Sequence, residues 1–268
     1  MSLHDWHLHT GFSSDSDEKM ERVAETAIGQ GMTCICITDH YDMGYPTGEF
    51  CLDTEAYLQK LRGVQEAFRG RCDIRAGVEM GLQPELPLAE SISRYCEEMP
   101  FDFVIGSVHL LHGVDPYDRD QIPEDDRTMY RRYFECVLDC VRACRGFQSL
   151  GHLDYVVRYG YTRAEHYHWE DYREIIDAVL EELIRRNIAL EVNTAGLRQG
   201  LGFPNPAPGI LHRYRELGGE RITVGSDAHR ACDVGYGFET ARELIRQAGF
   251  RYVTEFREKS PYFLPIDT

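Results

Sequence analysis

The stretch TCICITDH, residues 33–40, joins a short apolar, β-branched run to a histidine at its end. A run of this length and composition predicts a buried β-strand over residues 33–38. Six further strands are predicted on the same grounds, at residues 6–8, 73–78, 101–105, 147–150, 188–192 and 221–224. Longer amphipathic stretches separate them and predict helices at residues 17–29, 54–69, 126–144, 172–186, 207–217 and 238–247. Strands that alternate with helices indicate an α/β fold with a parallel sheet covered by helices.

The polar residues at the strand ends favour a barrel over an open sheet. In a β/α barrel the functional side chains follow the carboxyl ends of all the strands, whereas an open doubly wound sheet gathers them at one switch point. Each of the seven predicted strands here is followed by, or ends in, such residues: His7 and His9, His40, Glu79, His109, His152, Glu191 and Asn193, and Asp227 and His229. Because no repeat, low-complexity tract or linker interrupts the pattern, we expect one domain over residues 1–268.

Composition limits the partners of the chain. Its 45 acidic and 29 basic residues give a net charge of −16, which disfavours binding to nucleic acid or to an anionic membrane. The sequence has no basic, apolar signal segment at its start and no apolar run long enough to span a membrane, so we expect a cytoplasmic protein. Nine cysteines without a CxxC pair argue against a disulfide framework and a zinc ribbon. Cys136, Cys140 and Cys144 are predicted to be buried thiols.

The strand-end residues themselves point to a metal cluster. Side chains alternate along a strand, so His7 and His9 face the same way and can converge on one ion. Burying several unpaired ionisable groups costs several kcal/mol each, and bound cations remove that cost. Imidazoles mixed with a few carboxylates suit Zn, Mn or Fe, whereas sites made of oxygen ligands suit Mg or Ca.

Seven motifs occur in order along the chain: HLHT at 7–10, TDH at 38–40, GVEM at 77–80, GSVHL at 106–110, GHLD at 151–154, EVNTAGLR at 191–198 and GSDAH at 225–229. This set resembles the polymerase and histidinol phosphatase (PHP) family, and within it the branch of stand-alone histidinol-phosphate phosphatases. The resemblance implies a distorted seven-stranded β/α barrel, similar to a TIM barrel, that holds three divalent metal ions.

The resemblance also implies which residues bind each ion. The first ion would be held by His7, His9, Glu79 and Asp227. The second would share Glu79 and add His109 and His152. The third would be held by Asp15, His40 and His229. Other branches of the family offer a histidine at the position of Asp15, and an oxygen ligand there would change the metal preference of the third site.

In such a cluster, the two ions bridged by Glu79 are expected to activate a water molecule. The resulting hydroxide would attack the phosphorus atom of the substrate. Asp227 and His229 are the candidates for protonating the departing alcohol. Arg158 and Arg198 follow the fifth and sixth predicted strands, and a guanidinium fork matches a phosphate group. The alternative for each arginine is a surface salt bridge with one of the many acidic residues.

The expected reaction is hydrolysis of L-histidinol phosphate to L-histidinol and phosphate in histidine biosynthesis, and this substrate follows from the resemblance. The sequence leaves open a relative that hydrolyses another small phosphomonoester or a nucleotide diester with the same metals. A proofreading-type domain associated with a polymerase is disfavoured, since no polymerase region is present and the negative charge offers no basic track for DNA. The oligomeric state is left open.

Overall fold

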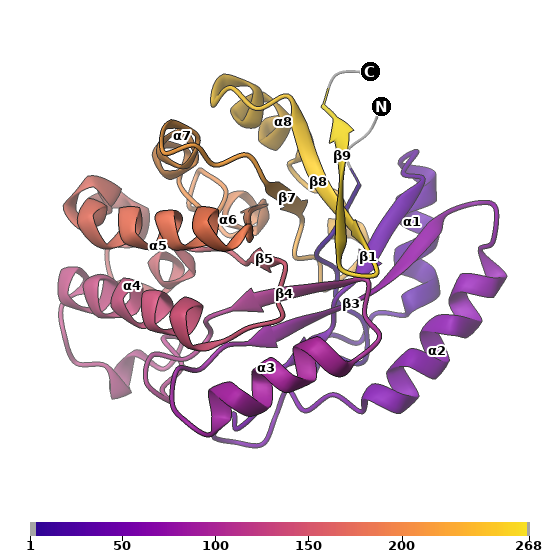
Figure 1. Cartoon of the computed structure of the whole chain (residues 1–268), viewed down its shortest axis with the longest axis horizontal. Coiled ribbons are helices and arrows are strands. Elements are labelled where there is room, and N and C mark those ends of the chain that lie inside the picture. The colour runs from indigo at the N-terminus through magenta and orange to yellow at the C-terminus, as the bar shows by residue number, and fades with distance from the viewer. Residues whose placement is uncertain (1–3, 267–268) are drawn as a thin grey trace.

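The computed structural model describes residues 4–266 and shows a curled parallel sheet surrounded by helices (Figure 1). The sheet order is β1-β3-β4-β5-β6-β7, so strands that follow each other along the chain are neighbours and no switch point exists along this path. The strands are β1 (Cys34–Ile37), β3 (Asp73–Gly81), β4 (Phe103–Ser107), β5 (Ser149–Leu150), β6 (Ala189–Asn193) and β7 (Ile222–Gly225). A short β2 (His40–Tyr41) follows β1 and also pairs with β3 in parallel. This order excludes the doubly wound arrangement.

The segment of residues 5–9 lies between β7 and β1 and joins the two edges of the sheet. The Trp6 N–H donates to the Val224 carbonyl at 3.0 Å on one side, and the Thr38 N–H donates to the Leu8 carbonyl at 2.8 Å on the other. Its pairing with each neighbour is limited to isolated bridges, so the strand predicted at residues 6–8 is not a regular ladder. The backbone bonds nevertheless complete a ring of seven chain segments, and the predicted distorted α/β barrel is confirmed.

Helices cover the outside of this ring. They are α1 (Met20–Gly29), α2 (Thr54–Ala67), α3 (Leu88–Glu98), α4 (Asp126–Ala143), α5 (Arg173–Arg186), α6 (Ala195–Arg198), α7 (Pro208–Glu216) and α8 (Phe238–Gln247). Aspartates cap two of them: the Asp53 carboxylate accepts from the Ala56 N–H at the start of α2, and the Asp125 carboxylate accepts from the Thr128 N–H at the start of α4. Two of these helices, α3 and the one-turn α6, are not among those predicted from the sequence.

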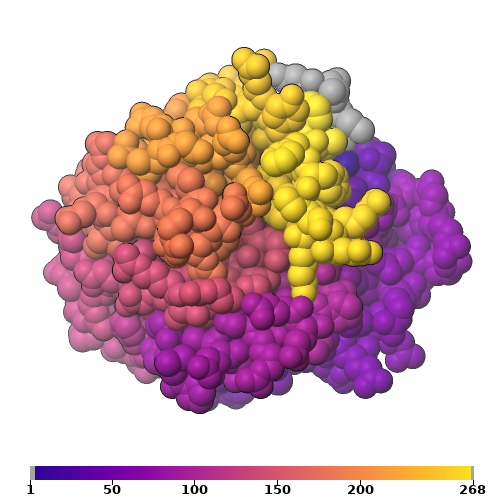
Figure 2. Space-filling view, viewed as in Figure 1, coloured from indigo at the N-terminus to yellow at the C-terminus, as the bar shows by residue number. Residues whose placement is uncertain are grey.

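A hairpin at the end of the chain, absent from the sequence analysis, closes the opposite end of the barrel from the strand ends discussed above. Its strands are β8 (Tyr252–Arg257) and β9 (Ser260–Pro265), which pair antiparallel. The ring of Phe256 stacks on Phe103 at 5.1 Å, and Trp6 meets Phe103 edge-on at 5.3 Å. Because Trp6 and Phe103 lie at the amino ends of their segments, these rings fill the amino end of the barrel. Figure 2 shows the hairpin, in yellow, covering part of the face seen there.

The three cysteines within and directly after α4 are buried, as predicted. Cys136, Cys140 and Cys144 direct their thiols to the carbonyl oxygens of Leu110, Leu82 and Gln83 at 3.8, 3.5 and 3.4 Å. They pack α4 against the loops that follow β3 and β4. Among residues 4–266, no helix has both the length and the apolar character that crossing a membrane requires.

Gly225, the last residue of β7, gives a direct test of the packing at the barrel's carboxyl end. A Cβ atom at this position would lie 2.2 Å from the His7 Cβ and 2.7 Å from a carboxylate oxygen of Glu191. We expect Gly225→Ala to lower the free energy of unfolding by about 1–3 kcal/mol because both neighbours are fixed in the core. Urea denaturation measures this change.

The matched control is Gly63→Ala in α2, where an added Cβ would meet nothing within 4 Å. Alanine in an open helix interior is expected to raise the free energy of unfolding by about 0.5–1 kcal/mol. Equal stability of the Gly225→Ala variant and the parent protein would contradict the close approach of β7 to His7.

Candidate metal centre and active site

Glu79, on β3, is the centre of the residues gathered at the carboxyl end of the barrel. Its side chain is buried, and histidines from four other chain segments surround its two oxygens. The Oε1 atom lies 2.8 Å from His152 Nε2 and 3.2 Å from His109 Nε2, while Oε2 lies 2.9 Å from His40 Nδ1, 3.1 Å from His7 Nε2 and 3.4 Å from His9 Nε2. Each carboxylate oxygen therefore faces its own set of imidazoles.

Asp227 adds a second carboxylate beside the first set. Its Oδ1 atom lies 3.4 Å from His9 Nε2, 3.9 Å from His7 Nε2 and 3.5 Å from His229 Nδ1. The residue follows β7 with a φ of 54°, a left-handed conformation that is uncommon outside glycine and asparagine or aspartate. Backbone strain of this kind concentrates at functional sites, and here it accompanies a side chain that meets three imidazoles.

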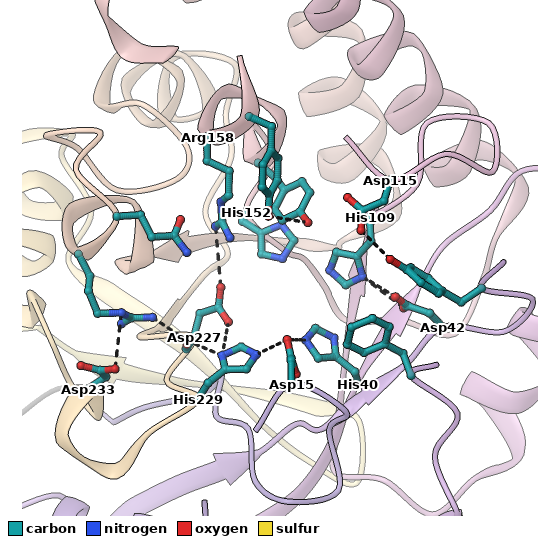
Figure 3. A pocket seen from close by; sticks show the side chains of 16 residues that line it. Asp15, His40, Asp42, His109, Asp115, His152, Arg158, Asp227, His229 and Asp233 are labelled. Atoms are coloured by element: carbon teal, nitrogen blue, oxygen red, sulfur yellow. Dashed lines mark hydrogen bonds and ion pairs between the residues drawn. The ribbon is translucent and has the colours of Figure 1, made fainter. Parts of the chain in front are cut away.

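Asp15, His40 and His229 form a third group next to the first. The Asp15 Oδ2 atom lies 3.1 Å from His229 Nε2 and 3.8 Å from His40 Nε2, and Figure 3 shows the carboxylate between the two rings. Both rings stack on His9, with centroid separations of 4.2 Å for His40 and 4.0 Å for His229. Asp15 is 44 % exposed, so this group is the one open to solvent.

Several buried ligand-type atoms in these groups have no hydrogen-bond partner. They are His7 Nε2, His9 Nε2, His40 Nδ1, His229 Nε2 and Glu79 Oε2. A buried polar atom without a partner costs about 1–3 kcal/mol, and five of them in one place form an arrangement that a bound cation would satisfy. Imidazole nitrogens and carboxylate oxygens are both ligands for divalent metals, so the residues present fit the expected cluster.

The groups of the site differ in protonation. Burial opposes the charged forms of His7 and His109, but the carboxylates beside them outweigh it and raise the pKa of both imidazoles well above the usual value. Glu79 and His9, in contrast, are held in the forms that bind metal ions. Burial opposes the charged form of Glu79, but the neighbouring imidazoles of His7, His40 and His109 hold its pKa well below the usual value. Burial, together with the charges of His229 and His40, lowers the pKa of His9 well below its usual value. An ionised carboxylate and a neutral imidazole are the forms that bind metal ions.

Carboxylates behind the histidines fix the orientation of their rings. Glu191 Oε1 accepts from His7 Nδ1 at 2.6 Å, and Glu191 Oε2 accepts from the His152 backbone N–H at 2.8 Å. Asp42 accepts from His109 Nδ1 at 2.9 Å. Partners of this kind select which ring nitrogen is free to bind a metal. Glu191 was expected at a strand end without an assigned role, and Asp42, two residues after the TDH motif, was not predicted as a site residue.

A cavity of about 380 Å³ opens above these groups. Asp15, His40, His109, His152, Asp227 and His229 line it, whereas His7, His9 and Glu79 lie beneath them in the core. Its volume falls in the range of small-molecule sites. All nine side chains expected to bind metal are thus brought together at one end of the barrel, under one opening.

The two predicted phosphate-binding arginines both line this cavity, but their hydrogen bonding differs. Arg158, in a 3-10 turn (Tyr155–Tyr159), is 8 % exposed and packs over the Tyr155 ring at 4.5 Å. Its Nε and one terminal nitrogen have no hydrogen-bond partner, and the nearest carboxylate oxygen, on Asp227, is 3.9 Å away. In Figure 3 this guanidinium points towards Asp227. Arg158 is therefore a buried cation with free donors at the cavity wall.

Arg198, the last residue of α6, is engaged with the protein instead. Its two terminal nitrogens donate to the carbonyl oxygens of Ser226 at 3.2 Å and Asp227 at 2.9 Å, and its Nε lies 3.8 Å from Asp233. The side chain thereby supports the strained backbone at Asp227. The ion pair of Arg158 is buried, whereas the pair of Arg198 with Asp233 is partly exposed and resembles the salt bridge considered as its alternative.

Comparison with known proteins defines the class to which this fold and site belong. Residues 5–195 match the model of the PHP domain, and the chain belongs to the PHP family. This confirms the resemblance drawn from the seven motifs.

Two relatives and one solved structure are similar to this chain over more than nine tenths of its length. The chain is 33 % identical to the histidinol-phosphatase of Lactococcus lactis subsp. lactis (strain IL1403), over 94 % of this chain and 93 % of the relative. It is 32 % identical to a probable histidinol-phosphatase of Clostridium acetobutylicum, over 93 % and 95 % of the two chains. The crystal structure of the Lactococcus lactis histidinol phosphate phosphatase, complexed with zinc, L-histidinol and phosphate, superposes with a TM-score of 0.88 at 32 % identity and covers 97 % of this chain and 99 % of that one.

Proposed function

We propose that residues 1–268 form one metal-dependent phosphomonoesterase domain that hydrolyses L-histidinol phosphate to L-histidinol and phosphate, a step of histidine biosynthesis. The observation that carries the proposal is one cavity that combines buried, unpartnered metal-ligand atoms with the free donors of Arg158. The full-length similarity to a phosphatase crystallised with zinc, L-histidinol and phosphate supports the choice of substrate.

The proposed ligand sets follow the three groups of side chains. His7, His9, Glu79 and Asp227 would hold one ion. Glu79, His109 and His152 would hold a second, and Asp15, His40 and His229 a third. Bound zinc, manganese or iron would supply positive charge at the phosphate and lower the pKa of a water molecule for attack on phosphorus.

The protein's own groups would then bind and orient the ester. Arg158 presents its free N–H groups to the cavity, where they can donate to phosphate oxygens. Arg198 holds the carbonyl groups of residues 226 and 227 and keeps Asp227 in place, and its guanidinium edge also reaches the cavity. Asp227 and His229 line the same space, and one of them protonates the departing alcohol oxygen.

Purified protein is expected to contain close to three equivalents of divalent metal, because the nine proposed ligands form three sets. Prolonged dialysis against a strong chelator should abolish phosphatase activity, and added Zn²⁺, Mn²⁺ or Fe²⁺ should restore it. Elemental analysis alongside an assay for released phosphate measures both. Full activity in protein that holds less than one equivalent would contradict the metal cluster.

A substrate panel tests the reaction itself. L-histidinol phosphate is expected to give the highest kcat/KM in a panel that also contains other small phosphomonoesters and cyclic and linear nucleotide diesters. A higher kcat/KM for a nucleotide diester would replace the proposal with the second candidate of the sequence analysis.

We also propose that the enzyme acts in the cytoplasm on a small dissolved ester, without nucleic acid or a membrane as partner. Its net charge of −16 supports this, since it repels both polyanionic surfaces. Tight binding of DNA at ordinary salt would contradict it.

A further inference from the structure

Part of the cavity lining lies beyond the metal-ligand groups and has no role in the proposed reaction. Tyr45, Phe50, Asp115, Tyr155 and Tyr159 form this part of the lining. Figure 3 shows Asp115 on the side of His109 and Asp42, across the cavity from Asp233. A phosphomonoester whose phosphate meets Arg158 and the metal-ligand groups must place its alcohol part somewhere in the remaining space.

Asp115 differs from the other aspartates of the cavity. Asp15 and Asp227 face His229, Asp42 faces His109, and Asp233 lies near Arg198, so each of these carboxylates has a basic side chain beside it. The recorded partners of Asp115 are both uncharged: the Tyr45 hydroxyl donates to Oδ2 at 2.7 Å, and the Tyr117 backbone N–H donates to Oδ1 at 2.8 Å. Within residues 4–266, no Lys, Arg or His forms an ion pair with it.

Two rows of aromatic rings connect Asp115 with the proposed metal ligands. In the first, Phe50 meets His40 at 5.2 Å and Tyr45 at 4.9 Å, and Tyr45 bonds to Asp115. The row is continuous from imidazole to carboxylate.

The second row begins at His152. Tyr155 meets the His152 ring at 4.9 Å and the Tyr159 ring at 5.1 Å, and Tyr159 meets Tyr117 at 6.0 Å. The Tyr117 backbone N–H binds Asp115. Rings of both rows line the cavity, and the Asp115 carboxylate at its wall is oriented by the Tyr45 hydroxyl and by the Tyr117 backbone N–H.

We propose that Asp115 is the specificity residue for the alcohol part of the substrate, and that its carboxylate pairs with an ammonium group carried close to the phosphate ester. The inference rests on the proposed function, since L-histidinol phosphate carries an ammonium group on the carbon next to its phosphorylated CH₂ group. A fixed carboxylate without a cation of its own gains a charge-assisted partner when such a substrate binds. The flanking rings suit the same ligand, because a cation is attracted to aromatic faces.

The test compares L-histidinol phosphate with 3-(imidazol-4-yl)propyl phosphate, which lacks only the ammonium group. The readout is the kcat/KM for L-histidinol phosphate divided by the kcat/KM for the analogue without the ammonium group. Asp115→Asn keeps the oxygen that accepts from Tyr45 and removes the charge. We expect this substitution to lower the ratio about 10- to 100-fold, the range of a hydrogen bond to a charged group. Tyr45→Phe should lower the ratio in the same direction by a smaller factor, because it frees the carboxylate to rotate.

Asp120→Asn is the matched control, since Asp120 is an exposed aspartate of the same loop that does not line the cavity. Its ratio should equal that of the parent protein. An unchanged ratio in Asp115→Asn, or an equal fall in the control, would overturn the role of Asp115 while leaving the proposed reaction intact. Failure of the parent protein to hydrolyse L-histidinol phosphate would instead overturn the proposed function, and the subsite with it.

Discussion

Replacing Glu79 by glutamine is expected to lower kcat/KM for phosphomonoester hydrolysis by about a thousandfold or more, which corresponds to about 4 kcal/mol of transition-state stabilisation. Both carboxylate oxygens of Glu79 face imidazole nitrogens, at 2.8–3.2 Å for Oε1 and 2.9–3.4 Å for Oε2. Glutamine keeps the shape of the side chain but removes its charge, and it places an NH₂ group that cannot bind a cation on one side. Metal content should fall together with the rate.

His112→Ala is the control for this variant. His112 is 48 % exposed, stands three residues after His109 and lies outside the cavity lining, so its loss should leave metal content and kcat/KM close to those of the parent protein. Both variants are measured by elemental analysis and by phosphate release, and thermal unfolding shows that each is folded. Equal losses of activity in the two variants, or full metal content in active Glu79→Gln protein, would contradict the bridging position of Glu79.

Removing the guanidinium of Arg158 is expected to lower the rate of hydrolysis without changing the metal content. Arg158→Ala should keep the metals and lower kcat/KM about 100- to 1000-fold, as the loss of one preorganised donor to a transition state does. Its free N–H groups lie at the cavity wall, and the residue is not part of any of the proposed ligand sets. Lysine at this position should recover part of the loss, because a point charge keeps the attraction without the planar fork.

Two further arginine variants serve as comparisons for Arg158→Ala. Arg198→Ala should cost less, about tenfold, since its terminal nitrogens already donate to the carbonyl groups of Ser226 and Asp227 and its effect passes through the position of Asp227. Arg127→Ala, an exposed position outside the cavity, should change nothing measurable. If Arg158→Ala keeps the parent kcat/KM, or loses metal as Glu79→Gln does, Arg158 does not bind the phosphate.

The architecture and the residue types of the site follow from patterns in the sequence. Short apolar runs and amphipathic stretches report local burial, and they located the barrel strands and six of the helices within a few residues. Polar residues at seven strand ends predicted a barrel because parallel strands bring all their carboxyl ends to one face. The family resemblance then named the nine residues that the structure gathers there.

The hydrogen-bond partners of those residues depend on how distant chain segments meet in the fold. Glu191 accepts a hydrogen bond from His7, 184 residues away in the sequence, and Asp42 accepts one from His109, 67 residues away. No local sequence pattern could predict these pairs. The β8–β9 hairpin was not predicted, because each strand is stabilised by pairing with the other and no residue of β9 is fully buried. The sequence favoured a phosphate-binding role more for Arg198 than for Arg158, yet folding leaves donors of Arg158 free and engages those of Arg198. Sequence periodicity records which side chains are buried, whereas free hydrogen-bond donors and unpaired charges depend on which distant segments meet.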